Sequence, residues 1–462
     1  MGLGEVLARA DGLGATGAGH VTRQLALAQA WSDFGGQASL ATVGAAPAVL
    51  DRWRREGFTV LSPAGAAGRR PAWAVADGYD LGPDDIEPWR VAGAKVAQVD
   101  DHAAGAALGA SLIVDQNLGA RATAYRARRA ETVLVGPRYC LLRREHRRPP
   151  PRQVERRVAR VLLTLGGASP ADELARLERL VRAAVPGAEV VTFGPGATVD
   201  GVADVLASVD LAVAAAGTTT WELLAWGVPA LLVALAANQE PVADAVGAAG
   251  VALRLDAAGA EQQIASTAAD ADLRQALASG GQRLVDGDGA RRVAVALRAA
   301  AAATRPVGTD DIELLWNWAN DPSTRATAIH PEPISWVDHC AWFGAGRRSP
   351  DRFHRIVDVD GRPAGQVRFD GISSGGRAEI SVSVDRDRRG LGFGPVIIRA
   401  GMAALRREQP DLPVVALIRP ENQASLRSFD LAGFMVQGSE SRHGVDLLRL
   451  RDGDRQRVGG PR

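Results

Sequence analysis

The first candidate for chemistry is His20, which ends a glycine-rich stretch between an apolar run and an amphipathic one. Residues 9–28 read RADGLGATGAGHVTRQLALA, which predicts a strand end, a glycine turn and a helix in that order. A helix N-terminus favours the neutral imidazole over the imidazolium, and a neutral ring can act as a general base. A lone histidine more often caps a helix or packs in the protein interior. Beside these glycines we favour the catalytic interpretation.

The same stretch contains a literal GxGxxG pattern over residues 12–17, which is the fingerprint of dinucleotide binding. Such a site also needs an acidic residue at the end of the second strand, about 20 residues further on. Here the second expected strand runs into ATVGAAP, and the next acidic residue is Asp51. We therefore do not favour NAD binding.

A second candidate site consists of glycine and polar residues at the carboxyl ends of successive expected strands. Its members are Gly166, Gly167, Gly217, Thr218, Thr219, Glu222, Asn238 and Gln239. Backbone N–H groups and hydroxyls at helix starts suit a pyrophosphate, and Glu222 is placed to accept hydrogen bonds from ribose hydroxyls. Each set alone could be ordinary helix capping. Their recurrence at one sheet edge indicates a nucleotide.

A third candidate is the run RRGLGFG, which contains Arg389-x-x-Gly392-x-Gly394 between an expected strand over 378–384 and an expected helix. Consecutive backbone N–H groups in such a turn can cradle a pyrophosphate without a lysine. The chain has a single lysine, Lys95, so a phosphate-binding loop ending in Gly-Lys-Ser/Thr is excluded.

Composition limits the classes of function. The chain has 462 residues, 46% of them hydrophobic, with 54 Lys plus Arg against 53 Asp plus Glu and a formal net charge of +1. These values predict two or three globular domains and no nucleic-acid partner. Two cysteines 200 positions apart and seven histidines give no metal-ligand spacing, so no metal is expected. Without an apolar run of membrane length or a signal sequence, we expect a cytoplasmic protein with no membrane insertion.

The expected elements form two α/β lobes, residues 1–145 and 158–303, with a cleft between them. In the first lobe the apolar runs that predict parallel strands are 5–11, 38–42, 72–77, 95–101 and 111–117. A proline- and arginine-rich stretch, 143–157, joins the lobes. We interpret it as a solvated connection rather than an anion-binding patch. A last helix over 286–303 has Asp288 as its N-cap, and a calcium site at Asp286 and Asp288 lacks further ligands.

The pattern changes after residue 308. An Asp360-Gly361 pair between alternating strands predicts a β-hairpin, and residues 306–452 read as a separate α+β domain.

The motifs of the two lobes together resemble those of a known enzyme family. Residues 5 to about 300 resemble the UDP-sugar hydrolase of pseudaminic acid biosynthesis, which cleaves UDP-2,4-diacetamido-2,4,6-trideoxy-β-L-altropyranose. The matching stretches are RADG…GAGHVTRQLALA, DGYDL, VDDHA, DQN, GPRYCLLRREH, LTLGGA, AAGTTTWELLAWGVP and NQ. Two departures from relatives are Thr22, where a larger residue is usual, and His146, where an aromatic is usual.

This resemblance implies a GT-B-like pair of Rossmann-type lobes with UDP held chiefly by the second lobe. His20 would be the base that activates water for inverting attack at the anomeric carbon, and Tyr79 would orient sugar or water. Asp11, Gly19 and Arg23, in the matched stretch around His20, would contact the substrate.

Residues 306–450 resemble the GNAT family of N-acetyltransferases, through RRGLGFG, Asn422-x-x-Ser425 and Gly433-Phe434. The resemblance implies acetyl-CoA as cosubstrate, with its pantetheine along residues 379–384. The implied CoA-binding residues are Val382, Arg389, Gly390, Gly392, Phe393, Gly394, Asn422 and Ser425.

One departure concerns catalysis. Many GNAT relatives have a tyrosine four residues after the serine as general acid for the thiolate, and this chain has Phe429. Glu379 is the candidate base for the amine, against the alternative of an edge-strand charge. His330, His339 and His354 are unranked alternatives.

Together the two resemblances imply a bifunctional enzyme that acetylates N4 of a UDP-4-amino-6-deoxy sugar and then removes UDP by hydrolysis. Its partners would be a UDP-amino sugar and acetyl-CoA, and the oligomeric state is not predicted. One alternative is a GT-B glycosyltransferase that uses a UDP-sugar, fused to an acetyltransferase. Another is a nucleotide-sugar or CoA sensor that has lost catalysis.

Overall fold

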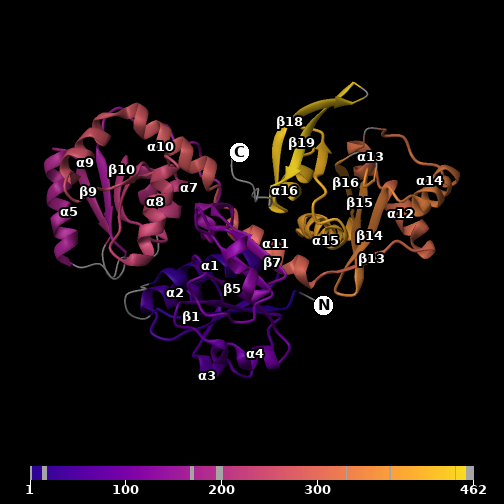
Figure 1. Ribbon diagram of the computed structural model, residues 1–462, viewed down its shortest axis with the longest axis horizontal. Coiled ribbons are helices and arrows are strands. Elements are labelled where there is room, and N and C mark those ends of the chain that lie inside the picture. The colour runs from indigo at the N-terminus through magenta and orange to yellow at the C-terminus, as the bar shows by residue number, and fades with distance from the viewer. Residues whose placement is uncertain are drawn as a thin grey trace. The chain divides into compact units, whose positions relative to one another are not determined.

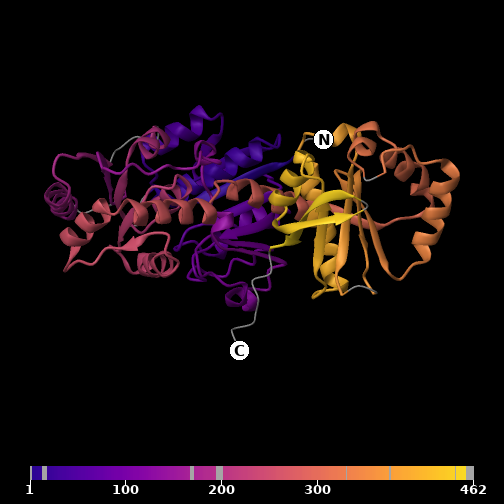
Figure 2. The same ribbon diagram turned by 90° about the horizontal axis from the view of Figure 1, so that it is seen from above.

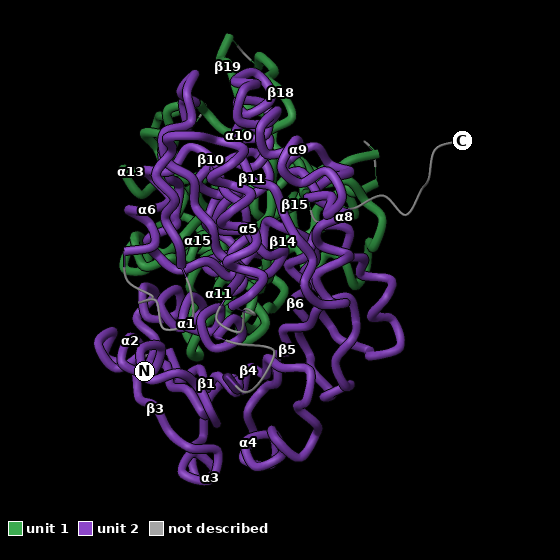
Figure 3. The backbone as a smooth tube through the Cα atoms, turned by 90° about the vertical axis from the view of Figure 1, so that its left-hand side faces the viewer, with its two compact units in different colours: residues 1, 294–462 green, residues 2–293 purple. Residues whose placement is uncertain are grey.

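The computed structural model describes residues 3–12, 18–166, 171–193, 201–328, 330–373, 376–442 and 444–453. Gly167 and most of the GxGxxG pattern lie outside these residues. The chain divides into two compact units, residues 2–293 and 294–462, coloured purple and green in Figure 3. The division falls inside helix α11 (Gly289–Ala301), within the last helix expected for the second lobe. The three domain boundaries drawn from the sequence stay predictions.

The first sheet of residues 2–293 has seven parallel strands in the order β3-β2-β1-β4-β5-β6-β7 (Figure 1). They are β1 (Glu5–Ala10), β2 (Gln37–Ala41), β3 (Thr59–Leu61), β4 (Trp73–Asp77), β5 (Lys95–Val99), β6 (Leu112–Asp115) and β7 (Thr132–Val135). The α-helices among them are α1 (Gly19–Ser32), α2 (Pro47–Arg55), α3 (Pro63–Ala66) and α4 (Glu87–Val91). The five predicted strands are confirmed. The two that sequence analysis missed, β3 and β7, are short strands at the two sheet edges.

The second sheet is also parallel, with five strands in the order β12-β11-β10-β8-β9. The strands are β8 (Arg160–Thr164), β9 (Glu189–Phe193), β10 (Leu211–Ala215), β11 (Ala230–Val233) and β12 (Leu253–Arg254). Its helices are α5 (Ala171–Ala184), α6 (Val202–Ser208), α7 (Thr219–Ala225), α8 (Glu240–Ala248), α9 (Ala260–Ala269) and α10 (Ala271–Leu284). Apolar runs at residues 160–167, 189–194, 210–217 and 229–235 predict strands followed by helices, and the structure confirms them as β8 to β11 with α5 to α8. The sequence did not predict β12, α9 and α10.

Both sheets are buried on both faces. Leu7 packs in one apolar cluster and its neighbour Ala8 in another, and Leu162 and Leu163 divide in the same way. Successive side chains of a strand point to opposite faces, so helices must cover each sheet on both sides. This explains why the strands read as continuous apolar runs.

Each parallel sheet has one place where the chain reverses its direction of travel across the strands. In the first sheet this place lies between β1 and β4, and in the second between β8 and β10. The loops after such strands leave in opposite directions and open a crevice at their carboxyl ends. The segment before His20 follows β1, and the segment Gly217–Thr219 follows β10, so the candidate residues lie where parallel sheets bind ligands.

The arginine-rich connection is solvated over much of its length, as expected, but several of its arginines also bind the fold. Arg143 donates to Glu222 at 3.2 Å, and the Arg148 Nε donates to Asp288 at 2.5 Å. The Arg152 guanidinium donates to the carbonyls of Leu206 and Val209, at the end of α6. A connection was predicted correctly, but its arginines form ion pairs and helix caps.

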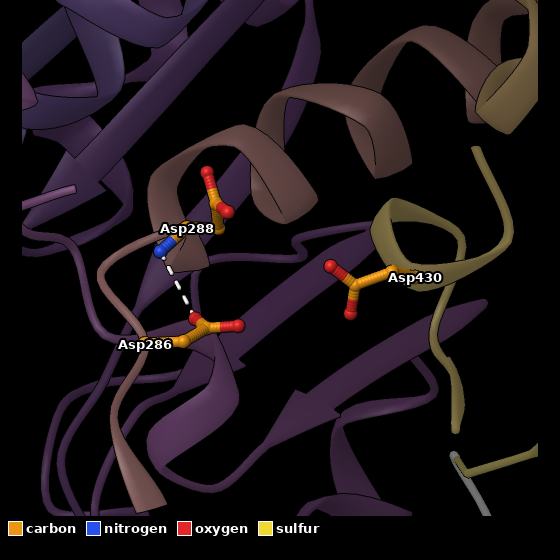
Figure 4. Close-up of side chains that lie close together, drawn as sticks. All are labelled: Asp286, Asp288 and Asp430. Atoms are coloured by element: carbon orange, nitrogen blue, oxygen red, sulfur yellow. Dashed lines mark hydrogen bonds between the residues drawn. The ribbon is translucent and has the colours of Figure 1, made fainter. Parts of the chain in front are cut away.

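The loop before α11 is fixed by carboxylates (Figure 4). The Asp288 N–H donates to Asp286 Oδ1 at 3.0 Å, and the Asp288 carbonyl accepts the Arg292 N–H at 3.1 Å. Asp286 in turn accepts two hydrogen bonds from the Arg292 guanidinium, at 2.5 and 2.7 Å. Asp288 thus directly precedes α11, as predicted for its N-cap residue.

Residues 294–462 contain a mixed seven-stranded sheet in the order β13-β14-β15-β16-β17-β19-β18 (Figures 1 and 2). The strands are β13 (Ala303–Pro306), β14 (Arg352–Val359), β15 (Arg362–Asp370), β16 (Ala378–Val384), β17 (Val414–Ile418), β18 (Phe434–Arg442) and β19 (Val445–Asp452). The helices are α12 (Ile312–Ala319), α13 (Pro322–Thr327), α14 (Trp336–Arg348), α15 (Phe393–Glu408) and α16 (Gln423–Leu431). The predicted hairpin is confirmed, with Asp360 and Gly361 at φ +54° and +71° between β14 and β15.

No helix in the described ranges combines enough length with enough apolar character to span a membrane.

The packing of α15 on β15 yields a stability prediction. A Cβ added to Gly401 of α15 would lie 2.4 Å from Val367 Cγ1, so Gly401→Ala should overpack this contact and destabilise the unit by about 1–3 kcal/mol. Gly344 of α14 is the matched control, because its nearest atom to such a Cβ is 3.8 Å away. Gly344→Ala should stabilise the unit by about 0.5–1 kcal/mol through helix propensity alone. Scanning calorimetry of the full chain measures both variants, and equal effects would contradict the packing argument.

Candidate functional sites

The first site centres on a hydrogen bond between His20 and Asp77. His20 is the second residue of α1, and Asp77 is the last residue of β4. His20 Nδ1 lies 2.6 Å from Asp77 Oδ1. A carboxylate can only accept, so the Nδ1 proton points to Asp77 and Nε2 is left as the acceptor nitrogen of a neutral ring. This is the tautomer that a general base using Nε2 requires.

Asp77 is held by three side chains from one face of α1. Besides His20, the Arg23 guanidinium donates to both carboxylate oxygens at 2.5 and 2.7 Å, and Gln24 Nε2 donates at 2.9 Å. Asp77 has no exposed surface. Burial alone would raise the pKa of Asp77, but the charge of Arg23 and the hydrogen bonds from Arg23 and His20 outweigh burial and hold that pKa well below its ordinary value.

Tyr79 lies beside the imidazole. Its ring meets the His20 ring edge-on with 5.1 Å between centroids, and its hydroxyl donates to Asp101 Oδ2 at 2.8 Å. The Asn238 amide, from the segment after β11, reaches the Tyr79 hydroxyl at 3.5 Å. Burial and the Asp101 carboxylate raise the pKa of Tyr79 well above its ordinary value. Tyr79 therefore stays protonated and offers its oxygen as an acceptor.

Asp101 connects the site to the next strand end. It accepts hydrogen bonds from Arg23 at 3.1 Å and from Asn117 Nδ2 at 2.8 Å, and Asn117 also donates to Asp115 at 3.0 Å. Burial raises the pKa of Asp101, but Arg23 more than offsets it and the net shift is downward.

Sequence reasoning assigned no role to Asp77, Asp101 or Gln24. A signal for them was present, because acidic residues end or closely follow three successive strands, β4, β5 and β6. The spacing His20-x-x-Arg23-Gln24 also places three polar side chains on one helix face.

The second-lobe residues gather at the start of α7. Thr218 is the N-cap residue, and the Thr220 and Trp221 N–H groups already donate to the Gly217 and Thr218 carbonyls. A Cβ on Gly19 would lie 3.3 Å from Thr218 Cγ2, so the starts of α1 and α7 approach closely. Gly166 follows β8 at φ +85°.

Glu222 faces the connection between the lobes. It lies 3.2 Å from both the Arg143 guanidinium and His146 Nε2. The Trp226 indole, which is only a donor, donates to His146 Nδ1 at 3.0 Å, so Nε2 carries the proton that Glu222 accepts. Burial raises the pKa of Glu222, but His146 and Arg143 lower it to about 2. A ribose hydroxyl would therefore meet a carboxylate that His146 and Arg143 already hold.

Two further candidates have structural partners. Asp11 accepts hydrogen bonds from Arg9 and from the Val43 N–H, which fixes the loop after β1. The Gln239 side chain accepts the Leu235 N–H at 2.9 Å, which shapes the loop before α8. Their predicted contacts with substrate stay predictions.

Among the remaining candidates, Val382 and Glu379 lie on β16, which separates from its parallel neighbour β17. Parallel strands β16 and β17 pair only at Ala378–Val414 and Glu379–Val415. Beyond that point Ile380–Val384 pair with β15 alone. On the β17 side of this stretch the Val384 carbonyl accepts Arg389 Nε at 3.2 Å, and the backbone groups of Val382 are left available to an extended ligand.

The glycine run forms the loop that enters α15. Gly390 and Gly392 take φ +74° and +73°, a conformation that L-residues rarely adopt, and Gly392 is the N-cap residue of the 16-residue helix. The first N–H groups of such a helix point into the loop and suit an anion. The loop therefore has the backbone geometry predicted for a pyrophosphate.

Comparison with known protein families gives a match for the region that contains this loop. Residues 304–435 match the family model described as an acetyltransferase (GNAT) domain. Residues 304–435 are a GNAT acetyltransferase domain. Such a domain takes its acetyl group from acetyl-CoA, which supports the predicted cosubstrate.

Solved structures similar to the GNAT domain share little sequence with it. The aminoglycoside acetyltransferase AAC(6′)-Ib in complex with ribostamycin and coenzyme A is 17% identical, with a TM-score of 0.31, over 35% of this chain and 99% of that one. Spermidine N-acetyltransferase from Vibrio cholerae with CoA and spermine is 14% identical, with a TM-score of 0.30, over 34% and 98%. A search of curated proteins finds no match to the chain. The hydrolase resemblance of residues 5–300 stays a prediction.

Arg389 of the GNAT domain uses its side chain to anchor the loop. Its guanidinium donates to Asp321 Oδ1 at 2.6 Å and to Thr324 Oγ1 at 3.2 Å, and its Nε donates to the Val384 carbonyl at 3.2 Å. Hydrogen bonds from Ser323 and from Arg389 hold the pKa of Asp321 well below its ordinary value. Arg389 thus ties the loop to the start of α13, and its contact with CoA remains a prediction.

Helix packing accounts for several other residues of the predicted cofactor site. A Cβ on Gly394 would lie 2.7 Å from Ser428 Oγ, so this glycine lets α15 and α16 approach. Asn422 caps α16 by accepting the Ser425 N–H at 3.1 Å. Phe429 is buried edge-on against Phe434, with 5.0 Å between ring centroids, and carries no acid.

The candidate bases differ in their surroundings. Glu379 lies on β16, an interior strand, so its interpretation as an edge-strand charge is wrong; it accepts a hydrogen bond from Arg442 at 2.7 Å. His339 hydrogen-bonds the Ile312 carbonyl at 2.9 Å, a structural contact. Burial, together with two nearby arginines, lowers the pKa of His354 to about 4, which makes it a weak base. His330 is exposed.

The pKa direction of Asp77 yields a pH prediction. At pH 7, Asp77→Asn should lower the free energy of unfolding by about 3–5 kcal/mol, because the buried Arg23 loses a charged partner. The native pKa of Asp77 is depressed, so its stabilisation is complete above the unfolded value of about 4 and is lost below it. The gap between wild type and variant should therefore narrow as the pH falls from 5 to 3.

Urea unfolding at several pH values measures this gap. Asp51→Asn is the control, because Asp51 is exposed and forms a surface ion pair with Arg54 on α2. A gap for Asp77→Asn that stays constant from pH 7 to pH 3 would contradict the assignment.

Proposed function

We propose that the chain is a bifunctional nucleotide-sugar enzyme. Its GNAT domain acetylates N4 of a UDP-4-amino-6-deoxy sugar. Residues 2–293, as a GT-B-like pair of Rossmann-type lobes, hydrolyse the resulting UDP-2,4-diacetamido-2,4,6-trideoxy-β-L-altropyranose, as in pseudaminic acid biosynthesis. The observation that carries the hydrolase half is the His20–Asp77 hydrogen bond at the strand reversal of the first sheet.

In the hydrolytic step His20 Nε2 accepts a proton from water as the water oxygen attacks the anomeric carbon. The bond from that carbon to the phosphate oxygen breaks, its electron pair leaves with UDP, and the configuration inverts. Asp77 stays ionised and stabilises the imidazolium that forms. The Tyr79 hydroxyl, whose proton points to Asp101, offers its oxygen to a sugar hydroxyl or to the water.

UDP is a good leaving group, so the diphosphate needs N–H donors more than a proton. The starts of α1 and α7, which approach at Gly19 and Thr218, supply N–H groups and positive helix ends from both lobes. Asn238, within reach of Tyr79, comes from the same edge of the second sheet. These contacts support placing the diphosphate between the two helix starts, with the anomeric carbon toward His20.

In the acetyl-transfer step the amine nitrogen attacks the thioester carbonyl, and the carbon–sulfur bond then breaks. Glu379 is the proposed acceptor of the amine proton, directly or through water, because among the candidates it alone is a carboxylate at the strand separation. Phe429 cannot protonate the leaving thiolate, so water does. The loop over residues 389–394 is proposed to bind the CoA pyrophosphate.

A mass-spectrometric time course of the purified chain with UDP-4-amino-4,6-dideoxy-N-acetyl-β-L-altrosamine tests both activities. Free diacetamido sugar and UDP should appear only when acetyl-CoA is present. If acetylated UDP-sugar accumulates intact, the hydrolase half is wrong, and a glycosyltransferase that awaits an acceptor replaces it.

A second prediction concerns the base. His20→Asn should slow UDP release by about 10²–10⁴-fold, the range that a general base contributes, while acetylation in the other unit continues at the wild-type rate. His102→Asn is the matched control, since His102 is an exposed histidine of the same lobe. Steady-state rates of UDP release and of CoA release, measured separately, decide the outcome. Full hydrolase activity in His20→Asn would remove His20 from the mechanism.

A further inference from the structure

One face of the third sheet is polar although helices α12 and α14 pack over part of it. Cross-strand partners share a face, so the register places Arg352, Asp370 and Glu379 in one row across β14, β15 and β16. The next row is His354, Arg368 and Ser381. The opposite face carries Val367 and other apolar side chains under α15. Charged residues therefore concentrate on the side away from α15.

Two arginines of this face share one carboxylate. Arg352 Nε donates to Asp370 Oδ1, and Arg368 Nε donates to Asp370 Oδ2, both at 2.6 Å. Within the described residues, the terminal nitrogens of these two guanidiniums have no hydrogen-bond partner. The pair thus keeps N–H groups that no described residue accepts.

An aromatic side chain orients the arginine pair. The Trp342 ring of α14 lies 4.9 Å from the Arg352 guanidinium carbon and 5.2 Å from that of Arg368. A Cβ on Gly346 would lie 2.1 Å from Arg352 Nη1, so this glycine lets Arg352 lie against α14. Both arginine side chains are about four-fifths buried. The pair is therefore held in place rather than free in solvent.

The local charge is positive. Asp370 neutralises only one of the two arginines, and Glu379 is already neutralised by Arg442 at 2.7 Å. His354, between the arginines and the interior, stays neutral near pH 7 because its pKa lies at about 4. One positive charge remains unbalanced on the Arg352–Arg368 pair.

This pair lies close to the strand separation. Strand β16 leaves β17 after Glu379, and Arg368 is the cross-strand partner of Ser381, two residues further along. Neighbouring strands are about 4.8 Å apart, so the backbones of Arg368 and Arg352 lie about 5 and 10 Å from β16. An acceptor whose amine enters the separation can reach both arginines with a second group.

We propose that Arg352 and Arg368 form an anion subsite of the acetyl-acceptor site, and that the acceptor is an amine carrying a phosphate or diphosphate. This inference rests on the proposed acetyltransferase function and adds the residues that would bind the phosphate groups of its acceptor. Bidentate hydrogen bonds from two guanidiniums match phosphate oxygens. The same surplus charge repels polycationic amines, so it selects against aminoglycosides and polyamines as well as for an anionic acceptor.

The test compares acceptors that differ only in their anionic group. Acetyl-CoA consumption by the full chain is measured with the UDP-4-amino sugar, the 4-amino sugar 1-phosphate, its neutral methyl glycoside and spermine. The two phosphorylated acceptors should have KM values at least about tenfold below that of the methyl glycoside, and spermine should be the poorest acceptor. If only the UDP-sugar has a lower KM than the methyl glycoside, the enzyme recognises the nucleoside and the proposed phosphate subsite is wrong.

Substitutions of the two arginines test whether they cause the low KM of the phosphorylated acceptors. Arg368→Gln and Arg352→Gln should each raise KM for the phosphorylated acceptors about tenfold or more and leave KM for acetyl-CoA and for the methyl glycoside near wild type. Arg368→Lys should restore part of the loss. Arg355→Gln is the matched control: it lies on the same strand, faces the other side of the sheet and pairs with Glu408.

The remaining outcomes distinguish a failure of the anion subsite from a failure of the acetyltransferase function. Acetylation of all four acceptors with similar KM, or no change in either glutamine variant, overturns the anion subsite and leaves the acetyltransferase function standing. No acetylation of any amine overturns both.

Discussion

A single buried carboxylate, Asp77, holds the first candidate site together. It ends β4 with no exposed surface, and His20, Arg23 and Gln24 of α1 all donate to it. A buried charge is tolerated only when it is paired and fully hydrogen-bonded, so the orientation of α1 against β4 and the tautomer of His20 depend on the same interaction. Arg23 extends the network to Asp101, which positions Tyr79. The His20 imidazole and the Tyr79 ring beside it are thereby placed by one continuous network of hydrogen bonds and ion pairs.

Local patterns in the sequence predicted most of the elements. Continuous apolar runs identified strands buried on both faces, and the Asp360-Gly361 turn identified the β14–β15 hairpin, because each signal arises within a few adjacent residues. The edge strands β3 and β7 were missed, since short edge strands bury too little to leave such a run. His20 was found from its glycine-rich surroundings. Asp77 was missed as its partner, because a contact across 57 positions depends on strand order, which a single sequence does not reveal.

In the GNAT domain, too, the contacts between distant elements could not be predicted from the sequence. Its glycine loop was predicted from spacing, and Gly390 and Gly392 take the required backbone conformation. The roles of individual side chains were harder to predict. Gly394 makes room for Ser428, Asn422 caps α16, and Arg389 reaches α13, so residues of one short motif serve helix packing as well as any ligand. The arginine pair on the polar face was not predicted, because its members come from two strands and meet only through their register.

The hydrogen bonds of Arg389 affect the entropy cost of binding a ligand at the loop over residues 389–394. A loop that closes only around its ligand loses conformational entropy at the moment of binding, and affinity falls accordingly. Here the guanidinium, held by Asp321, Thr324 and the Val384 carbonyl, orders the loop as part of the native fold. The loop is thus fixed in one conformation before any ligand arrives. The same side chain joins the loop to the start of α13, so the two segments are coupled through Arg389.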